Sequence, residues 1–241
     1  MPFELLIVLA GAFLAAFAVG LAGFADALIA SALWLHVLAP VEAVPLILAT
    51  GMVIHLISIV VLRRHVALGV LWPFLIGGTL GVPLGAWLLR YSDPEPFRMA
   101  VGAFLIAYSV FALLTSRLRA VTAGGRPADG AVGLVGGVLG GFAGLSGVVP
   151  TMWAGMRSWP RDVQRGVYQP FVFVMHGMAL GWLGFGGVLD AGLVNRFLWC
   201  LPLLLLGSWL GLKLYHRIDE QQFRRLILGL LLVSGAALVV Y

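Results

Sequence analysis

Charged residues are scarce in this chain of 241 residues, of which 10% are Asp, Glu, Lys or Arg. That is too little polar surface to cover a soluble globular protein of this size, because 61% of the residues are hydrophobic and the mean hydropathy is +1.05. The single cysteine, Cys200, excludes an internal disulfide. The composition therefore predicts an integral membrane protein.

The motifs of several enzyme classes are also missing. The sequence has no Gly-x-Ser-x-Gly elbow, no His-Glu-x-x-His zinc site and no P-loop. A hydrolase built from Ser146 and His176 is conceivable, but a serine in a glycine-rich segment is more simply explained as a hydrogen-bond donor. We therefore expect no enzyme, no cofactor and no metal site, and an ATP-driven pump would need a separate partner chain.

Apolar runs long enough to cross a membrane occur several times. An α-helix needs about 20 apolar residues to span a hydrocarbon core of about 30 Å. In the first half we predict such segments over 3–38, interrupted at Gly20 to Gly23, and over 42–62, 66–89 and 97–116. In the second half we predict them over 131–156, interrupted around Gly144, and over 162–183, 192–215 and 222–240.

The two halves share duplicated motifs. Gly20-Leu-Ala-Gly23-Phe-Ala-Asp26 is matched by Gly141-Phe-Ala-Gly144-Leu-Ser-Gly147, a shift of 121 residues (141 minus 20). A second match ends each half, where Asp93-Pro-Glu-Pro-Phe97-Arg98 corresponds to Asp219-Glu-Gln-Gln-Phe223-Arg224. Two matches in the same order predict an internal repeat. Its parts are a first membrane repeat over 1–116, a cytoplasmic connector over 117–130 and a second membrane repeat over 131–241.

Basic residues in short loops predict how the halves are oriented. The loop with Arg63 and Arg64 is cationic and is expected in the cytoplasm, whereas its counterpart around Asp190 carries one acid and is expected outside. The two repeats are therefore predicted to have inverted topology, with both termini on the periplasmic side of the inner membrane. Each repeat would be a hairpin-like interrupted segment plus three transmembrane helices, or five short spans.

The glycine-rich interruptions indicate a binding site. Irregular backbone at membrane depth leaves polar groups unpaired, so it persists only where protein or a watery cavity covers it. If symmetry brings both interruptions together, the helices that begin near Phe24 and Leu145 would point their N-termini at one cavity, which favours an anion. The residues expected to bind the substrate there are Gly20, Gly23, Phe24, Ala25, Gly141, Gly144, Leu145, Ser146 and Gly147. Scattered glycines such as Gly11 and Gly133 are expected to permit close helix packing instead.

Polar residues inside the predicted spans extend this site. His55 and His176 are 121 residues apart, the same shift as the glycine motifs, and both a packing role and an anion-binding role are open for them. Asp26 either caps the helix that follows the first interruption or takes a proton that accompanies the substrate. The neutral donors that could complete an oxyanion cage are Thr50, Ser146, Tyr168 and Gln169.

The repeated glycine segments, followed by Pro40 and Pro150, and a turn over Leu80-Gly81-x-x-x-Gly85 resemble the TauE/SafE sulfite exporter family over nearly the whole chain. Family members usually have glycines where this chain has Ala25-Asp26. The resemblance implies transport of a small sulfur-containing anion such as sulfite, thiosulfate or a sulfonate, coupled to an ion gradient.

We therefore expect a multi-pass secondary transporter of the inner membrane that works by alternating access, with Asp26 as the candidate for proton coupling. The alternative is a passive anion channel with the same central cavity. The expected partners are the small anion and the lipid bilayer, with a homodimer left open and no nucleic acid, because the basic residues form no stripe.

Overall fold

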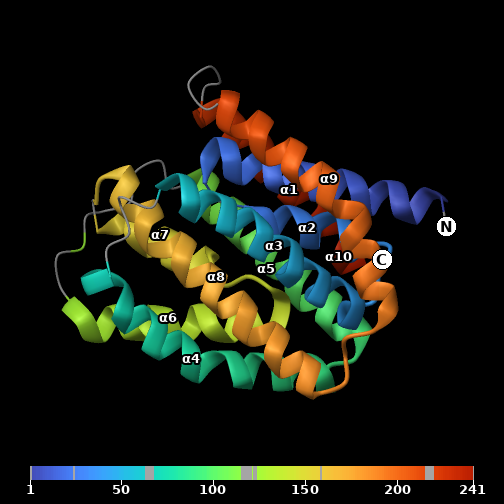
Figure 1. The fold of residues 1–241 in the computed structure, drawn as a ribbon, viewed down its shortest axis with the longest axis horizontal. Helices are drawn as coiled ribbons and strands as arrows, with labels where there is room; N and C mark the ends of the chain where they lie inside the picture. Colours follow the sequence, from blue (N-terminus) through green and yellow to red (C-terminus); the bar gives the residue numbers. More distant parts are fainter. Residues whose placement is uncertain are drawn as a thin grey trace.

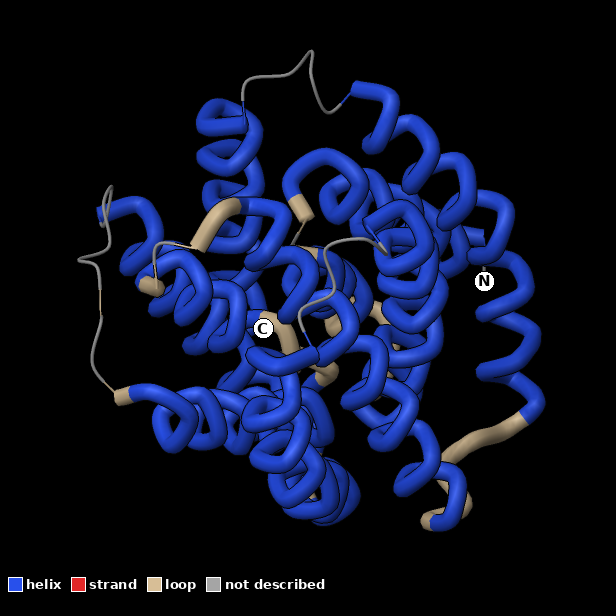
Figure 2. The backbone as a smooth tube through the Cα atoms, turned by 60° about the vertical axis from the view of Figure 1, so that its left-hand side comes forward, coloured by secondary structure: helices blue, strands red, loops and turns tan. Residues whose placement is uncertain are grey.

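The computed structural model of the chain describes residues 2–23, 25–62, 68–114, 121, 124–157, 159–214 and 220–240. These residues form helices and connecting loops, with no strand among them (Figures 1 and 2). The first half contains α1 (Pro2–Ala22), α2 (Asp26–Trp34), α3 (Pro40–Leu62), α4 (Leu68–Tyr91) and α5 (Pro94–Leu114). The second half contains α6 (Gly125–Ala143), α7 (Val148–Met156), α8 (Arg161–Phe185), α9 (Ala191–Leu214) and α10 (Glu220–Val240). The prediction of an all-α membrane protein is confirmed.

Among the described residues, five helices are long and apolar enough to cross a membrane, judged by length and composition. They are Phe3–Ala22, Pro40–Val61, Leu68–Tyr91, Pro94–Leu114 and Ala191–Leu214. Helix α8 has the length, at 25 residues, but polar side chains such as Tyr168, Gln169 and His176 interrupt its apolar surface. This polar long helix thus carries three of the residues predicted for the site.

Both predicted interruptions are present. Helix α1 ends at Ala22 and α2 begins at Asp26, while α6 ends at Ala143 and α7 begins at Val148. Left-handed backbone terminates the longer helix in each case, with φ of 84° at Gly23 and 75° at Gly144. The longer helix therefore ends in the same way in both halves, but the short helix begins differently, because Ala25 before α2 has φ of 81° and Gly147 before α7 has φ of −80°.

Each interrupted segment has arms of unequal length. Helix α1, with 21 residues, is about 30 Å long and can cross the membrane, whereas α2, with nine residues, reaches about 14 Å. Helix α2 folds back along α1, because the Trp34 Nε1–H donates to the Val8 carbonyl over 3.1 Å. The hairpin prediction is therefore refined: a full-length helix is followed by a short one that returns beside it.

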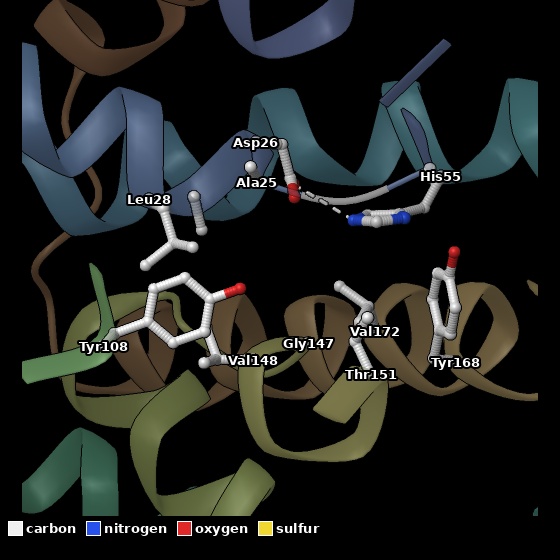
Figure 3. A pocket seen from close by; sticks show the side chains of 12 residues that line it. Ala25, Asp26, Leu28, His55, Tyr108, Gly147, Val148, Thr151, Tyr168 and Val172 are labelled. Carbon is white, nitrogen blue, oxygen red and sulfur yellow. Dashed lines mark hydrogen bonds and ion pairs between the residues drawn. The ribbon is translucent and has the colours of Figure 1, made fainter. Parts of the chain in front are cut away.

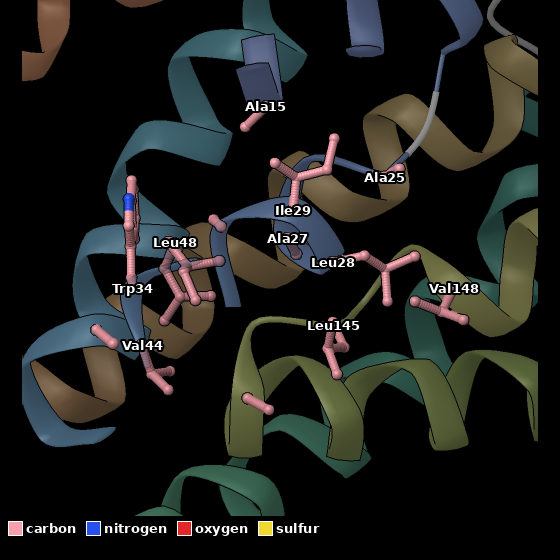
Figure 4. Close-up of a cluster of buried hydrophobic side chains, with 14 of the residues drawn as sticks. Ala15, Ala25, Ala27, Leu28, Ile29, Trp34, Val44, Leu48, Leu145 and Val148 are labelled. Carbon is pink, nitrogen blue, oxygen red and sulfur yellow. The ribbon is translucent and has the colours of Figure 1, made fainter. Parts of the chain in front are cut away.

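Helix α2 lies in the centre of the hydrophobic core. Its residues Asp26 to Ala32 and Trp34 are buried. Figure 4 shows Leu28 opposite Leu145 and Val148 of the second interruption, so apolar side chains join the two interrupted segments. A Cβ at Gly11 would overlap the Trp34 indole, which confirms the packing role expected for this glycine.

The two halves pack against each other in a symmetrical scheme. Helix α3 packs on its counterpart α8, and α5 packs on its counterpart α10. Two further large contacts also join the halves. Helix α4 packs on α6, and their counterparts α9 and α1 pack on each other in the same way. Both ends of the chain lie at the same end of the helix bundle (Figure 1).

Glycines make the closest contact between α4 and α6. A Cβ at Gly85 would lie closer than 3.0 Å to the Val138 carbonyl oxygen, and one at Gly141 would lie equally close to the Val82 carbonyl. Such small residues let helix backbones approach each other in membranes. Helix α4 runs through Gly81 and Gly85 without a break, so the prediction of a turn there is wrong.

The contact between α1 and α9 repeats this arrangement in the other half. A Cβ at Gly20 would lie 2.8 Å from the Ser208 carbonyl oxygen, and one at Gly211 would lie closer than 3.0 Å to the Phe17 carbonyl. Each residue of α1 stands 121 positions before its counterpart in α6, and each residue of α9 stands 126 positions after its counterpart in α4. The same backbone contact is thus made twice.

Candidate functional site

The two histidines predicted from the repeat meet in the middle of the fold. Each stands 15 residues after the first residue of its helix, His55 after Pro40 in α3 and His176 after Arg161 in α8. Both side chains are buried, and their rings pack edge to face with centroids 5.8 Å apart. The close packing of α3 on α8 therefore brings the equivalent positions of both halves together.

Asp26 joins this pair from the first interruption. It is the first residue of α2, it is buried, and its Oδ2 lies 3.0 Å from His55 Nε2. A carboxylate in the first turn is stabilised by the helix dipole, so this position suits the capping interpretation as well. The contact also gives the buried acid the cationic or hydrogen-bonding partner that it needs in an apolar environment.

Helix α8 holds the backbone of both interruptions through two side chains. The Gln169 Nε2–H donates to the Gly23 carbonyl over 3.0 Å, and the Gln169 Oε1 contacts His55 Nδ1. His176 Nε2 lies 3.1 Å from the Gly144 carbonyl oxygen. One polar helix thus satisfies a carbonyl group in each interruption.

A narrow pocket of about 20 Å³, room for about one water molecule, lies beside this polar cluster (Figure 3). Its walls come from both interruptions and from α2, α3, α5, α7 and α8. The lining residues are Gly23, Ala25, Asp26, Ala27, Leu28, His55, Tyr108, Gly147, Val148, Thr151, Tyr168 and Val172. The side chains of Asp26, His55, Tyr108, Thr151 and Tyr168 give this small space several polar groups.

The structure brings some of the predicted substrate-binding residues to this pocket and leaves others outside it. Lining it are Gly23, Ala25, Asp26, His55, Tyr168 and Gly147. Gly144, Gln169 and His176 lie behind the lining. Gln169 bonds to the Gly23 carbonyl, His176 bonds to the Gly144 carbonyl, and both side chains contact His55. Phe24 lies outside the described residues.

Five predicted residues have other surroundings. Gly20 and Gly141 serve helix packing, as described above, because they precede the interruptions by three residues and still belong to the long helices. The Thr50 hydroxyl donates to the Leu46 carbonyl of its own helix over 2.7 Å. Leu145 and Ser146 are buried outside the pocket lining, with Ser146 packed against Gly140.

Other pocket residues were not predicted from the sequence. Tyr108 comes from α5 and carries no motif, so only the tertiary fold brings it here. Thr151 stands four residues after Gly147, and this helical spacing could have indicated that it shares a face with the break. Arg165 of α8 was not predicted either, and its guanidinium lies beside the pocket: a Cβ at Gly23 would be 2.6 Å from Arg165 Nε and 2.6 Å from Tyr168 Oη.

Ion pairs fasten the two ends of the bundle. Arg196 of α9 lies 2.9 Å from Glu42 of α3 and 3.2 Å from Glu4 of α1. Arg157 after α7 lies 3.4 Å from the buried Asp129 of α6. Among the described residues, no group of three or more His, Cys, Asp or Glu is arranged to hold a metal ion.

His36 lies in the connection between α2 and α3, outside the pocket lining. Its Nε2 lies 2.9 Å from Ser234 Oγ of α10. Burial, followed by the positive charge of Arg98, lowers the pKa of His36, so it stays neutral near pH 7 and contributes a hydrogen bond without a charge.

The sequence model of the family described as "Sulfite exporter TauE/SafE" matches residues 8–238. The chain belongs to that family. The match spans both interruptions and both central histidines, and it makes the protein a multi-pass membrane protein of a transporter family whose membership implies transport of a sulfur-containing anion. No curated protein and no solved structure is significantly similar to the chain.

Proposed function

We propose that this TauE/SafE protein is a secondary transporter that carries a small anion of the sulfite, thiosulfate or sulfonate type across the inner membrane by alternating access, coupled to protons. The observation that supports this best is the meeting of two helix interruptions, one from each half, beside one polar pocket. Transporters built from repeats place their substrate at such broken helices, because unpaired backbone groups and helix ends can bind an ion there.

An anion fits the second interruption better than the first. The first turn of α2 already contains Asp26, whose carboxylate takes the place that an anion would occupy at that helix end. Helix α7 has no acid in its first turn, and its N-terminal residues Gly147 and Val148 line the pocket. The anion would therefore lie near the start of α7, where the partial positive charge of the helix end favours it.

Side chains around this position can complete the anion site. Figure 3 shows the hydroxyl groups of Tyr108 and Tyr168 directed toward the pocket, and Thr151 lies on its floor. Arg165 adds a positive charge beside Gly23. Hydroxyl donors and a guanidinium are the groups that bind oxyanions in proteins, so the chemistry of the lining agrees with a sulfur oxyanion.

The symmetrical packing supports the proposed inverted repeat. Each half would cross the membrane an odd number of times, whether it is a hairpin plus three spans or five short spans, so the second repeat, over 131–241, would begin on the opposite side of the membrane from the first, over 1–116. The connector over 117–130 would be cytoplasmic and both termini periplasmic. Rocking of one repeat against the other would then expose the shared pocket to each side in turn.

This topology predicts that Arg64→Cys and Gly186→Cys will react with a membrane-impermeant maleimide from opposite sides of the membrane. Cys200 is buried and should give little background, so each cysteine can be introduced into the native chain, with the unchanged chain as the control for labelling of Cys200. Labelling of intact cells should modify position 186, and modification of position 64 should need permeabilised membranes. Modification of both positions from the same side would contradict the inversion.

Transport itself is tested by counterflow in proteoliposomes with labelled sulfite, thiosulfate, sulfoacetate and sulfate. We expect saturable counterflow of at least one sulfur anion, because a carrier exposes its loaded site alternately to both sides. A channel would give flux that saturates only at high concentration and could not concentrate the anion. Counterflow of none of the four anions would contradict the proposed function.

A further inference from the structure

The hydrogen bonds around His55 have directions that the chemistry of the groups determines. The Gly23 carbonyl can only accept, so the group facing it is the Gln169 amide nitrogen, which donates over 3.0 Å. The amide oxygen of Gln169 therefore faces His55 Nδ1. Because this oxygen can only accept, His55 Nδ1 carries a hydrogen.

This assignment decides what lies between His55 and Asp26. With its hydrogen on Nδ1, a neutral imidazole would present the lone pair of Nε2 to Asp26 Oδ2, which is 3.0 Å away. An ionised carboxylate also presents lone pairs, and two lone pairs at this distance repel. One further proton must therefore lie between the two atoms. It resides either on Nε2, giving an imidazolium and a carboxylate, or on Oδ2, giving a neutral imidazole and a carboxylic acid.

His176 is hydrogen-bonded differently. Its Nε2 faces the Gly144 carbonyl at 3.1 Å and must donate to it. Its Nδ1 is buried and makes no hydrogen bond of normal geometry among the described residues, although the Leu48 backbone lies near the ring. A buried imidazolium would need a partner for both hydrogens, so the neutral form suits these surroundings. His176 thus holds a backbone carbonyl, whereas the Asp26–His55 pair holds a transferable proton.

The repeat places this pair in one half only. The position equivalent to Asp26, 121 residues later, is Gly147, and the position equivalent to Gln169, 121 residues earlier, is Leu48. The second interruption therefore has neither the acid nor the amide that fixes the tautomer. One half supplies the proton pair and the other supplies an uncharged helix end.

We propose that the Asp26–His55 pair is the proton carrier of the transporter and that its single proton travels in the same direction as the anion. This inference rests on the transport function proposed above. The loaded pair has no net charge, whereas loss of one H⁺ to water leaves a charge of −1 beside the pocket. The anion and the deprotonated pair are like charges. Repulsion between two unit charges about 5 Å apart, at an effective dielectric constant of about 20, weakens binding of the anion roughly a hundredfold. The anion therefore binds mainly when the pair is protonated, and by linkage the bound anion retains the proton.

The other titratable groups that face the pair, among the described residues, are Arg165, Tyr168 and His176 from α8 and Tyr108 from α5. The positive charge of Arg165 favours loss of the proton from the pair. A bound anion keeps the proton on the pair, because loss of the proton would leave two negative charges side by side. The arrangement therefore makes proton binding depend on whether the anion is present.

The test replaces Asp26 with asparagine. In Asp26→Asn the amide can still donate to His55 Nε2, and the pair is permanently uncharged, as it is when loaded. Labelled sulfite and labelled thiosulfate are followed in parallel in proteoliposomes, with the membrane voltage held at zero. We expect the wild type to accumulate the anion inside the vesicles about tenfold per pH unit by which the external solution is more acidic than the interior, the limit for one proton per anion. Asp26→Asn should keep counterflow, at a reduced rate, but accumulate nothing, and its apparent affinity should no longer depend on pH.

Glu95→Gln serves as the matched control, because Glu95 is an exposed acid at the start of α5, and it should accumulate the anion like the wild type. Accumulation by Asp26→Asn equal to the wild type would overturn the proposal. Wild-type counterflow that ignores the pH gradient would also overturn it, while leaving the transport function intact. No wild-type counterflow at all would remove the transport function and the proton carrier together.

Gln169→Leu gives a second test that retains both members of the pair. Without the amide, His55 can place its hydrogen on Nε2 and donate to an ionised Asp26, so the deprotonated pair keeps its hydrogen bond. The pH profile of transport should then move to lower pH by about one unit or more, because the proton is lost more readily. A folded Gln169→Leu protein with an unchanged profile would overturn the role given to the tautomer.

Discussion

Leucine at position 23 or 144 should abolish transport without preventing insertion into the membrane. Gly23 and Gly144 have φ of 84° and 75°, where a residue with a Cβ costs about 1–2 kcal/mol. A Cβ would also lie 2.6 Å from Arg165 Nε at position 23 and 2.6 Å from Ile47 Cγ2 at position 144. Leucine would therefore displace the backbone that forms the pocket, and we expect counterflow below about 1% of the wild-type rate, a loss of about 3 kcal/mol.

Gly181→Leu is the matched control for these variants. Gly181 lies on α8, the helix that carries His176, and a Cβ there would meet nothing within 4 Å. The variant should transport at close to the wild-type rate, because leucine on an exposed surface of a membrane helix faces lipid. Size-exclusion chromatography in detergent should show folded protein for all three variants. Normal counterflow by Gly23→Leu or Gly144→Leu would remove the corresponding interruption from the site.

The repeat made the centre of the site predictable from the sequence. A shift of 121 residues relates both the glycine motifs and the two histidines, and equivalent positions near a two-fold axis meet in space. Periodicity within a single helix carries no such long-range information. For this reason the meeting of His55 and His176 could be predicted, whereas the approach of Tyr108 from α5, which has no matching motif, could not.

Local sequence could not separate glycines that break a helix from glycines that pack one. Gly20 and Gly23 belong to one motif, yet Gly20 contacts α9 from within α1 while Gly23 ends that helix. Both roles need a residue without a side chain, and the difference depends on which surface faces a neighbouring helix. Thr50 is a second case. Its residue type suggests a donor for the substrate, but its hydroxyl donates to a carbonyl group of its own helix.

Alanine at position 133 should destabilise the protein, whereas alanine at position 130 should not. The two glycines lie on one face of α6, but a Cβ at Gly133 would be 2.6 Å from Phe74 Cα, while the nearest atom to a Cβ at Gly130 is the Pro73 carbonyl oxygen at 3.6 Å. At Gly133 the backbones of α4 and α6 must separate, which costs about 1–3 kcal/mol by overpacking. At Gly130 the methyl group fits, and alanine stabilises a helix by about 0.5–1 kcal/mol relative to glycine.

Thermal unfolding of the purified variants in one detergent measures this difference. The apparent melting temperature of Gly133→Ala should fall by several degrees, and that of Gly130→Ala should stay equal or rise. Equal melting temperatures would mean that the close contact between α4 and α6 does not limit stability. That contact lies outside the pocket lining. Gly133→Ala should therefore melt at a lower temperature, but the protein that remains folded should still perform counterflow. This result would separate the glycines that hold the halves together from those that form the site.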